Sequence, residues 1–164
     1  MSVLRSLAAL FALGVVQVFL PQVWSGLGVI DWLLIYVVVQ SLRSSFHGSI
    51  LLGAGAGLIQ DGLAGGILGL HAFAKTSVAG LIAAFGGFLV VRGPLPEAIV
   101  VGAATALEGL IVEAWQMMLG RPVSIDLFDV AIRAVATAIA AFAALSALRR
   151  WEQRALRRSH VGRR

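Results

Sequence analysis

The chain has 164 residues, of which 59% are hydrophobic and 13% are charged, and its formal net charge is +5. Ordinary soluble domains have roughly 45–50% apolar and about 25% charged residues, so this composition indicates an integral membrane protein. A bilayer core about 30 Å thick needs about 20 apolar residues per helix, so six spans would use about 120 residues and leave little for a soluble domain.

Apolar segments separated by turn signals predict six membrane-spanning helices in a compact, all-α bundle. The predicted segments are 4–20, 29–46, 48–59, 68–91, 98–119 and 130–148. The first is interpreted as a retained helix and not as a cleaved signal peptide, because further spans follow it. Pro21 and the sequence RGPLP at 92–96 mark breaks, since proline ends one helix and suits the first turn of the next.

The positive charge is concentrated at the end of the chain. Residues 1–148 hold six Arg or Lys and seven Asp or Glu, whereas residues 149–164 hold seven Arg and one Glu. Topology and contact with anionic lipid explain a short basic segment after a membrane helix, so no nucleic-acid partner is expected. We therefore divide the chain into a transmembrane domain, 1–148, and a basic cytoplasmic tail, 149–164.

Basic residues mark alternate ends of the predicted helices and so predict an orientation. Arg5, Arg43, Arg92 and the tail fall at one set of ends, and acidic residues such as Asp31 mark the other set. Because Lys and Arg favour the cytoplasmic side, both termini are expected in the cytoplasm. The chain is thus expected to cross a membrane several times.

Three ionisable residues interrupt the apolar, glycine-rich stretch GLIQDGLAGGILGLHAFAKTSVAG: Asp61, His71 and Lys75. His71 and Lys75 are four residues apart and share a helical face, where an inward-facing carboxylate could meet them. An ionisable group at the bilayer centre costs about 2.5–3.5 kcal/mol, so such groups are usually paired or functional. Two interpretations stay open. Asp61 bonds local backbone in a turn with His71 satisfied nearby, or the three form a polar pocket or a partner-binding site.

Two further carboxylates, Glu108 and Glu113, lie on the fifth segment, and Arg133 lies in the first turns of the sixth. Residues five apart on a helix project about 140° apart, so the two carboxylates do not form an acid/base pair on one face. Arg133 is expected to pair with one of them across helices, or with Asp129 at i,i+4. A proton relay and the docking of a partner's polar group are the other interpretations.

Glycines are expected at close helix contacts and turns. Candidates of this kind are Gly53, Gly57, Gly62, Gly66 and Gly69. The Gly53-xxx-Gly57 spacing lets two helix backbones approach, and Ala8-xxx-Ala12 is a shorter ladder of the same type. The GAGAG run at 53–57 lacks the GxGxxG spacing and no GK[ST] follows a glycine run, so nucleotide binding is not expected.

Catalytic signatures are missing from the sequence. There is no cysteine, the three histidines (His47, His71 and His160) are scattered, and no Ser/His/Asp order suggests a nucleophile. We therefore expect a protein that is not an enzyme and that uses no metal and no cofactor.

The stretch QDGLAGGILGLHAFAKT, set between two apolar helices, resembles the signature of the rod shape-determining protein MreD family. The matching positions are Gly57, Leu58, Asp61, Gly66, Gly69, Leu70, His71 and Ala72. The chain length, the six predicted spans and the basic tail also resemble that family, and the resemblance covers nearly the whole chain. One departure is that the family often has Ser-Gly and then Pro-Leu-Gly, where this chain has Ala64-Gly65 and Ile67-Leu68-Gly69.

This resemblance implies a non-enzymatic, multi-pass subunit of the bacterial cell-elongation machinery, located in the bacterial cytoplasmic (inner) membrane. Its partner would be the bitopic protein MreC and, through the complex, the actin-like MreB and the peptidoglycan synthase pair. MreD-like proteins are also similar in fold to the substrate-binding S components of energy-coupling-factor transporters, which is the alternative function. A vitamin pocket needs several convergent polar and aromatic groups, and this chain has one Tyr and no Asn. We therefore expect a groove near Asp61, His71 and Lys75 that receives a segment of the partner.

Overall fold

The computed structural model describes residues 3–65, 67–86, 91, 93–121 and 126–161. These residues form six α-helices and one short 3-10 helix, and no strand occurs among them. The elements are α1 Val3–Val23, η1 Ser25–Val29, α2 Trp32–Ser41, α3 Phe46–Ala64, α4 Leu70–Phe85, α5 Pro94–Met118 and α6 Leu127–Val161. The predicted all-α class is confirmed for this part of the chain.

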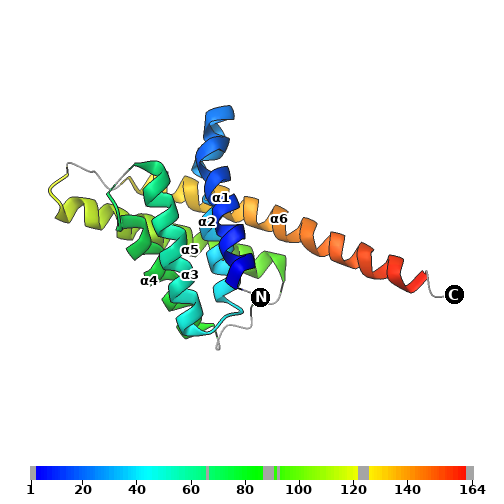
Figure 1. Cartoon of the computed structure of the whole chain (residues 1–164). Helices are drawn as coiled ribbons and strands as arrows, with labels where there is room; N and C mark the ends of the chain where they lie inside the picture. Colours follow the sequence, from blue (N-terminus) through cyan, green and yellow to red (C-terminus); the bar gives the residue numbers. More distant parts are fainter. Residues whose placement is uncertain (1–2, 66, 87–90, 92, 122–125, 162–164) are drawn as a thin grey trace.

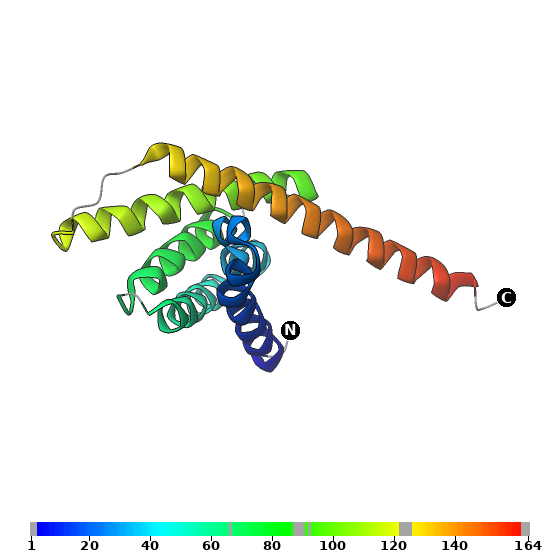
Figure 2. The same ribbon diagram turned by 90° about the horizontal axis from the view of Figure 1, so that it is seen from above.

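The helices pack in two close pairs around a central short helix. α3 lies against α4 and α5 lies against α6, while α2 contacts all five other α-helices. Figures 1 and 2 show α5 and α6 side by side, with the C-terminal half of α6 projecting beyond the other helices. The boundary that we drew after residue 148 falls inside α6, which continues to Val161.

α2 lies at the centre because eight of its ten residues are apolar or aromatic, and five of these are buried. Leu33 and Val37 join one core cluster with α1, α3 and α4, and Leu34 and Val38 join a second with α4, α5 and α6. A helix that is apolar on every face needs protein or lipid on every face. Its ten residues rise only about 15 Å, half of a bilayer core.

Several predicted helix ends differ from those observed. The predicted segment 29–46 is interrupted at Asp31, where η1 has ended and α2 begins. α1 continues through Pro21 but ends two residues later at Val23, so the helix stops within one turn of a residue that lacks an N–H and whose ring crowds the carbonyl four residues earlier. α3 runs to Ala64, five residues beyond its predicted end, so Asp61 lies in a helix and not in a turn.

The closest backbone contact in the α3–α4 pair occurs where the sequence predicted it. A Cβ atom at Gly57 would lie 2.2 Å from Cα of Ala72, and one at Gly53 would lie 2.6 Å from the carbonyl oxygen of Lys75. Real side-chain atoms do not approach backbone this closely, so only glycine allows α3 and α4 to pack at this distance. The close-packing role predicted for Gly53 and Gly57 is confirmed.

The other predicted glycine positions behave differently. Gly69 has φ +98° and precedes α4, a backbone conformation that favours glycine. Gly62 lies within α3, and a Cβ atom there would meet nothing within 4 Å, so it is neither a close contact nor a turn. Gly66 lies outside the described residues. Ala8 and Ala12 are exposed, and α1 instead approaches α3 at Gly14, where a Cβ atom would lie 2.5 Å from Ile59.

Two helices in the described part of the chain are long and apolar enough to cross a membrane. They are Pro94–Met118 and Leu127–Arg154. Length and composition thus support a membrane protein with transmembrane helices. The number of spans and the side of each terminus stay predictions.

Candidate functional site

Asp61 closes the N-terminus of α4 from the last turns of α3. Its side chain is 3% exposed. Oδ2 accepts hydrogen bonds from the N–H groups of Gly69 and Ala72 at 2.8 and 3.2 Å, and Oδ1 accepts one from the N–H of His71 at 3.1 Å. A carboxylate satisfies the free donors of a helix N-terminus and interacts favourably with its dipole. The interpretation in which Asp61 bonds local backbone is the one observed, although from a helix.

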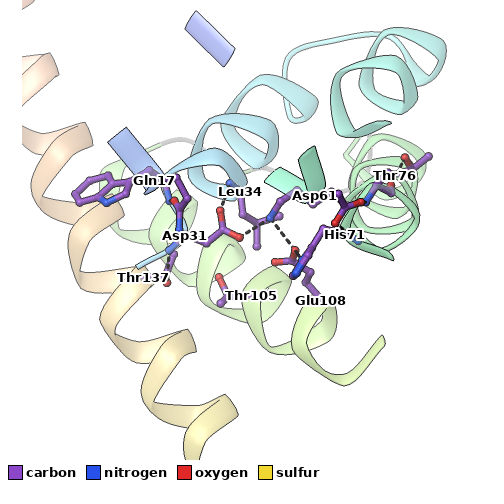
Figure 3. Close-up of polar contacts among 12 residues, drawn as sticks. Gln17, Asp31, Leu34, Asp61, His71, Thr76, Thr105, Glu108 and Thr137 are labelled. Carbon is purple, nitrogen blue, oxygen red and sulfur yellow. Dashed lines mark hydrogen bonds and ion pairs between the residues drawn. The ribbon is translucent and has the colours of Figure 1, made fainter. Parts of the chain in front are cut away.

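Lys75 is the centre of a buried charge network that links α4 to α2 and α5. It is fully buried, and its Nζ donates to Oδ2 of Asp31 and, at 2.7 Å, to Oε1 of Glu108. Nδ1 of His71 lies 3.3 Å from the same Glu108 oxygen. Figure 3 shows Asp31, His71 and Glu108 pointing toward one centre, with Asp61 turned to the backbone at His71. His71 and Lys75 therefore lie in one cluster, but the carboxylates of that cluster are Asp31 and Glu108 and not Asp61.

Asp31 reaches this network because of a break between two helical segments. Its Oδ1 accepts the N–H of Leu34 at 2.7 Å and so caps α2, while Oδ2 faces Lys75. Gln17 of α1 satisfies the polar backbone of the break, accepting from the N–H of Trp32 at 2.8 Å and donating to the carbonyl of Ile30 at 3.0 Å. An irregular backbone inside a bundle requires such partners.

The network gives each buried charge a partner of opposite sign. The side chains of Lys75, Glu108 and Asp31 are 0, 6 and 13% exposed, and His71 is 30% exposed. Removing one member of a buried ion pair costs about 3–5 kcal/mol, because the other charge stays buried without a partner. The arrangement fixes the relative positions of three helices.

A polar cavity of about 280 Å³ lies beside the network. Asp31, His71 and Glu108 are among its lining residues, so three network residues also border this cavity. The other lining residues come from α1, η1, α3, α5 and α6, and their polar members are Gln17, Gln60, Thr105, Glu113, Gln116, Asp129 and Arg133. Although the sequence has few polar side chains, folding gathers many of them around one space. The sequence argument against a polar pocket did not foresee this arrangement.

Two buried oxygens on the cavity wall have no hydrogen-bond partner among the described residues. They are Oε1 of Gln60 and Oε2 of Glu113. Buried polar atoms are normally paired, so each such oxygen calls for an explanation. Both are acceptors, and neither has appreciable surface open to a water-sized molecule, so these two oxygens lie behind the cavity wall.

Arg133 does not neutralise Glu113. Its Nε lies 2.9 Å from Oδ2 of Asp129, one turn earlier on α6, and both side chains are at least half exposed. This i,i+4 pair was one of the two predicted arrangements, and it is the observed one. Glu108 and Glu113 differ accordingly, because Glu108 belongs to the buried network and Glu113 does not.

A second ionic contact, not predicted from the sequence, joins the other end of the bundle. Glu97 in the first turn of α5 is 4% exposed and accepts from Arg149 of α6 at 2.7 Å and from Arg43 at 3.3 Å. The side chain of Arg43 is 59% exposed while it pairs with Glu97. Arg149, assigned to the tail, is thus a structural contact of the bundle.

Asp31, Gln17 and Glu97 are the polar residues that sequence reasoning missed. Asp31 directly precedes an apolar run, a typical N-cap position, and that signal could have identified a buried helix start. In the described ranges, no group of three or more His, Cys, Asp or Glu side chains is placed to hold a metal ion. Comparison with protein-family models, curated proteins and solved structures gives no match for this chain.

Proposed function

We propose that this chain is a non-catalytic, multi-pass subunit of a bacterial cell-elongation complex, of the MreD type, that binds an MreC-like bitopic partner. The observation that carries the proposal is the α3–α4 hairpin. The stretch that resembles the family signature forms one structural unit, in which Gly57 packs on Ala72 and Asp61 caps α4. The spacing of Gly57, Asp61 and Ala72 in this stretch is therefore explained by the packing and capping contacts of the hairpin.

The placement of all six helices in the membrane is part of the proposal. Beyond the two long apolar helices, large hydrophobic side chains are exposed on the outer faces of α3 and α4. Leu51 is 73% exposed, Phe73 50% and Leu81 44%. Apolar surface spread over several helices is unfavourable in water and favourable in lipid.

The proposed orientation has both termini in the cytoplasm. Arg43, from the end of α2, and Arg149, from α6, meet at Glu97, so these basic residues belong to the same end of the bundle. The positive-inside rule assigns that end to the cytoplasm. The basic tail then lies near anionic lipid of the inner leaflet.

The polar cluster supports the partner surface indirectly in this proposal. Asp61 and Lys75 are buried by this chain's own helices, so a partner segment would not touch them. The expectation of a groove lined by Asp61, His71 and Lys75 is therefore replaced by a role in which these residues fix α4 against α2 and α5.

The test is purification of the tagged chain from native membranes in mild detergent, with mass spectrometry of proteins and small molecules. A bitopic MreC-like protein near one to one supports the proposal. Recovery of ATPase and coupling subunits, or of no bitopic protein at all, contradicts it. An Asp61→Ala variant and an exposed Asp126→Ala variant, both checked for folding, would then ask whether the hairpin is needed for binding.

The polar cavity favours the second candidate, the S component of an energy-coupling-factor transporter. Ligand pockets commonly enclose about 300–1,000 Å³, and the cavity of about 280 Å³ is near the lower limit of that range. A retained vitamin together with coupling subunits in the same purification would establish this function in place of the first.

A further inference from the structure

We infer that an apolar groove at the C-terminal end of α5 binds an anionic phospholipid, with an acyl chain in the groove and the phosphate on Arg121. The inference rests on the placement of the helices in a membrane and not on the proposed cell-elongation role. It follows from the lining of the groove, its position along α5 and the charge beside it.

The groove is a space of about 310 Å³ between the start of α4 and the end of α5. Phe73 and Trp115 meet there edge to face, with ring centroids 5.4 Å apart. The other lining residues are Ile67, Leu68, Gly69, Leu70 and Leu119. Leu68 is 72% exposed and Leu119 is 52% exposed, so these side chains leave the groove open. A lining without a charged side chain suits a hydrocarbon chain.

The groove lies near the level of the lipid headgroups when α5 spans the bilayer. α5 has 25 residues and rises about 37 Å, slightly more than the thickness of a bilayer core, about 30 Å. Trp115 lies in the last turn of this helix and Leu119 directly follows it. Tryptophan is enriched at membrane interfaces. A lipid whose headgroup lies just beyond Leu119 therefore places its acyl chain at the depth of the groove.

Arg121 places a positive charge just beyond this groove. It follows Leu119 by two residues, a separation of at most about 7 Å along the chain. The backbone turns at Gly120, which has φ +72°, and the N–H of Arg121 donates to the carbonyl of Gln116 at 3.1 Å. This bond holds Arg121 against the last turn of α5, at the headgroup end of the groove.

The guanidinium of Arg121 is available for an anion. The two acidic residues that follow it among the described residues are engaged elsewhere, since Asp126 accepts the N–H of Phe128 at 2.9 Å and Asp129 pairs with Arg133. Within the described ranges, Arg121 has no ion-pair partner. A guanidinium matches a phosphate with two parallel hydrogen bonds. Groove and charge together therefore favour a molecule with an apolar chain and an anionic headgroup.

The experiment measures contact between Trp115 and brominated lipid, because bromine on an acyl chain quenches the fluorescence of a tryptophan that it touches. The reporter chain carries Trp24→Phe, Trp32→Phe and Trp151→Phe and keeps Trp115. It is placed in phosphatidylcholine vesicles with an increasing fraction of brominated phosphatidylglycerol or of brominated phosphatidylcholine. Thermal unfolding checks that the reporter chain is folded. Native mass spectrometry of the lipids retained by the chain with all its tryptophans repeats the comparison independently.

Brominated phosphatidylglycerol should reach half-maximal quenching at an about fivefold lower fraction than brominated phosphatidylcholine. This ratio corresponds to about 1 kcal/mol, the contribution of one basic residue near anionic lipid. Arg121→Gln should remove the preference and leave quenching by phosphatidylcholine unchanged. The matched control is Arg150→Gln, which makes the same chemical change on the exposed part of α6 and should keep the preference.

A second reporter separates the groove from the general lipid surroundings of the protein. A chain that keeps only Trp24, which is 71% exposed, should be quenched equally by both lipids. The inference is overturned if Trp115 shows no preference for phosphatidylglycerol, if Arg121→Gln retains the preference, or if Trp24 shows it equally.

Weak quenching of Trp115 by both lipids, with strong quenching of Trp24, also overturns the inference, because another occupant such as a second copy of this chain then covers the groove. If neither tryptophan is quenched, the placement in the membrane fails together with the inference. Purification of the partner tests the cell-elongation role separately, so the two failures are distinguishable.

Discussion

Gly57 of α3 and Ala72 of α4 touch backbone to backbone, and a Cβ atom at Gly57 would lie 2.2 Å from Cα of Ala72. A Gly57→Ala variant must push the two helices apart and should lose about 1–3 kcal/mol of stability. Gly62→Ala, in the same helix, meets nothing within 4 Å and should gain about 0.5–1 kcal/mol from its higher helix propensity. Thermal unfolding in detergent compares the two, and equal effects would contradict the close contact.

Replacing Lys75 by Met should be among the most damaging single changes. It leaves Asp31 and Glu108 buried without their shared cation, so a loss of about 3–5 kcal/mol is expected. The double variant Lys75→Met, Glu108→Gln should recover part of this loss, since one buried charge is removed with its partner. Arg150→Met is the control at an exposed position. The ion pair is disproved if the double variant is no more stable than the single one.

Asp61→Ala should destabilise the start of α4. The change removes the acceptor of three backbone N–H groups, and loss of a helix cap costs about 0.5–2 kcal/mol. Hydrogen exchange should therefore become faster at the first turn of α4 than at the middle of α5. Asp61→Asn keeps one acceptor oxygen and should fall between the wild type and Asp61→Ala. Uniform exchange changes over both helices would indicate a global effect and not a capping role.

Glu97→Gln should lower stability more than Arg43→Gln. Glu97 is buried and holds two arginines, whereas the side chain of Arg43 is 59% exposed and its removal leaves the 2.7 Å pair with Arg149. Because exposed ion pairs contribute only about 0–1 kcal/mol, the loss of Arg43 should be small. Melting temperatures of the two variants measure the difference, and the reverse order would show that Arg149 does not hold Glu97.

Single cysteines can test the orientation, since the chain has none of its own. Cysteines replacing the exposed residues His47 and Glu152 should be protected from a membrane-impermeant maleimide added outside intact spheroplasts, and one replacing Asp126 should be labelled. Labelling after lysis gives the control for reactivity. External labelling at residue 152 would overturn the proposed cytoplasmic C-terminus.

Local signals in the sequence predicted the approximate positions of the helices, the glycines that allow close helix packing, and one ion pair within a helix. Gly53 and Gly57 were identified from their spacing, and the Arg133–Asp129 pair from i,i+4 proximity. Contacts between distant residues were missed. Lys75 meets Asp31 across 44 positions, and no periodicity of one helix carries that information.

The cavity was missed for the same reason. Its polar side chains come from five helices and appear in the sequence as isolated residues in apolar runs, each with a local explanation. Only their common location, produced by packing around α2, turns them into a site. Asp31 illustrates this point, because its position before an apolar run indicates a cap and does not indicate that the cap faces a lysine.

α6 carries contacts at two separate places in the molecule. Its 35 residues form one uninterrupted helix about 52 Å long, with Val130 and Arg133 on the cavity wall and Arg149 against Glu97. The helix also packs along α5. The cavity wall and the start of the basic segment therefore share one continuous backbone, which fixes the distance between them.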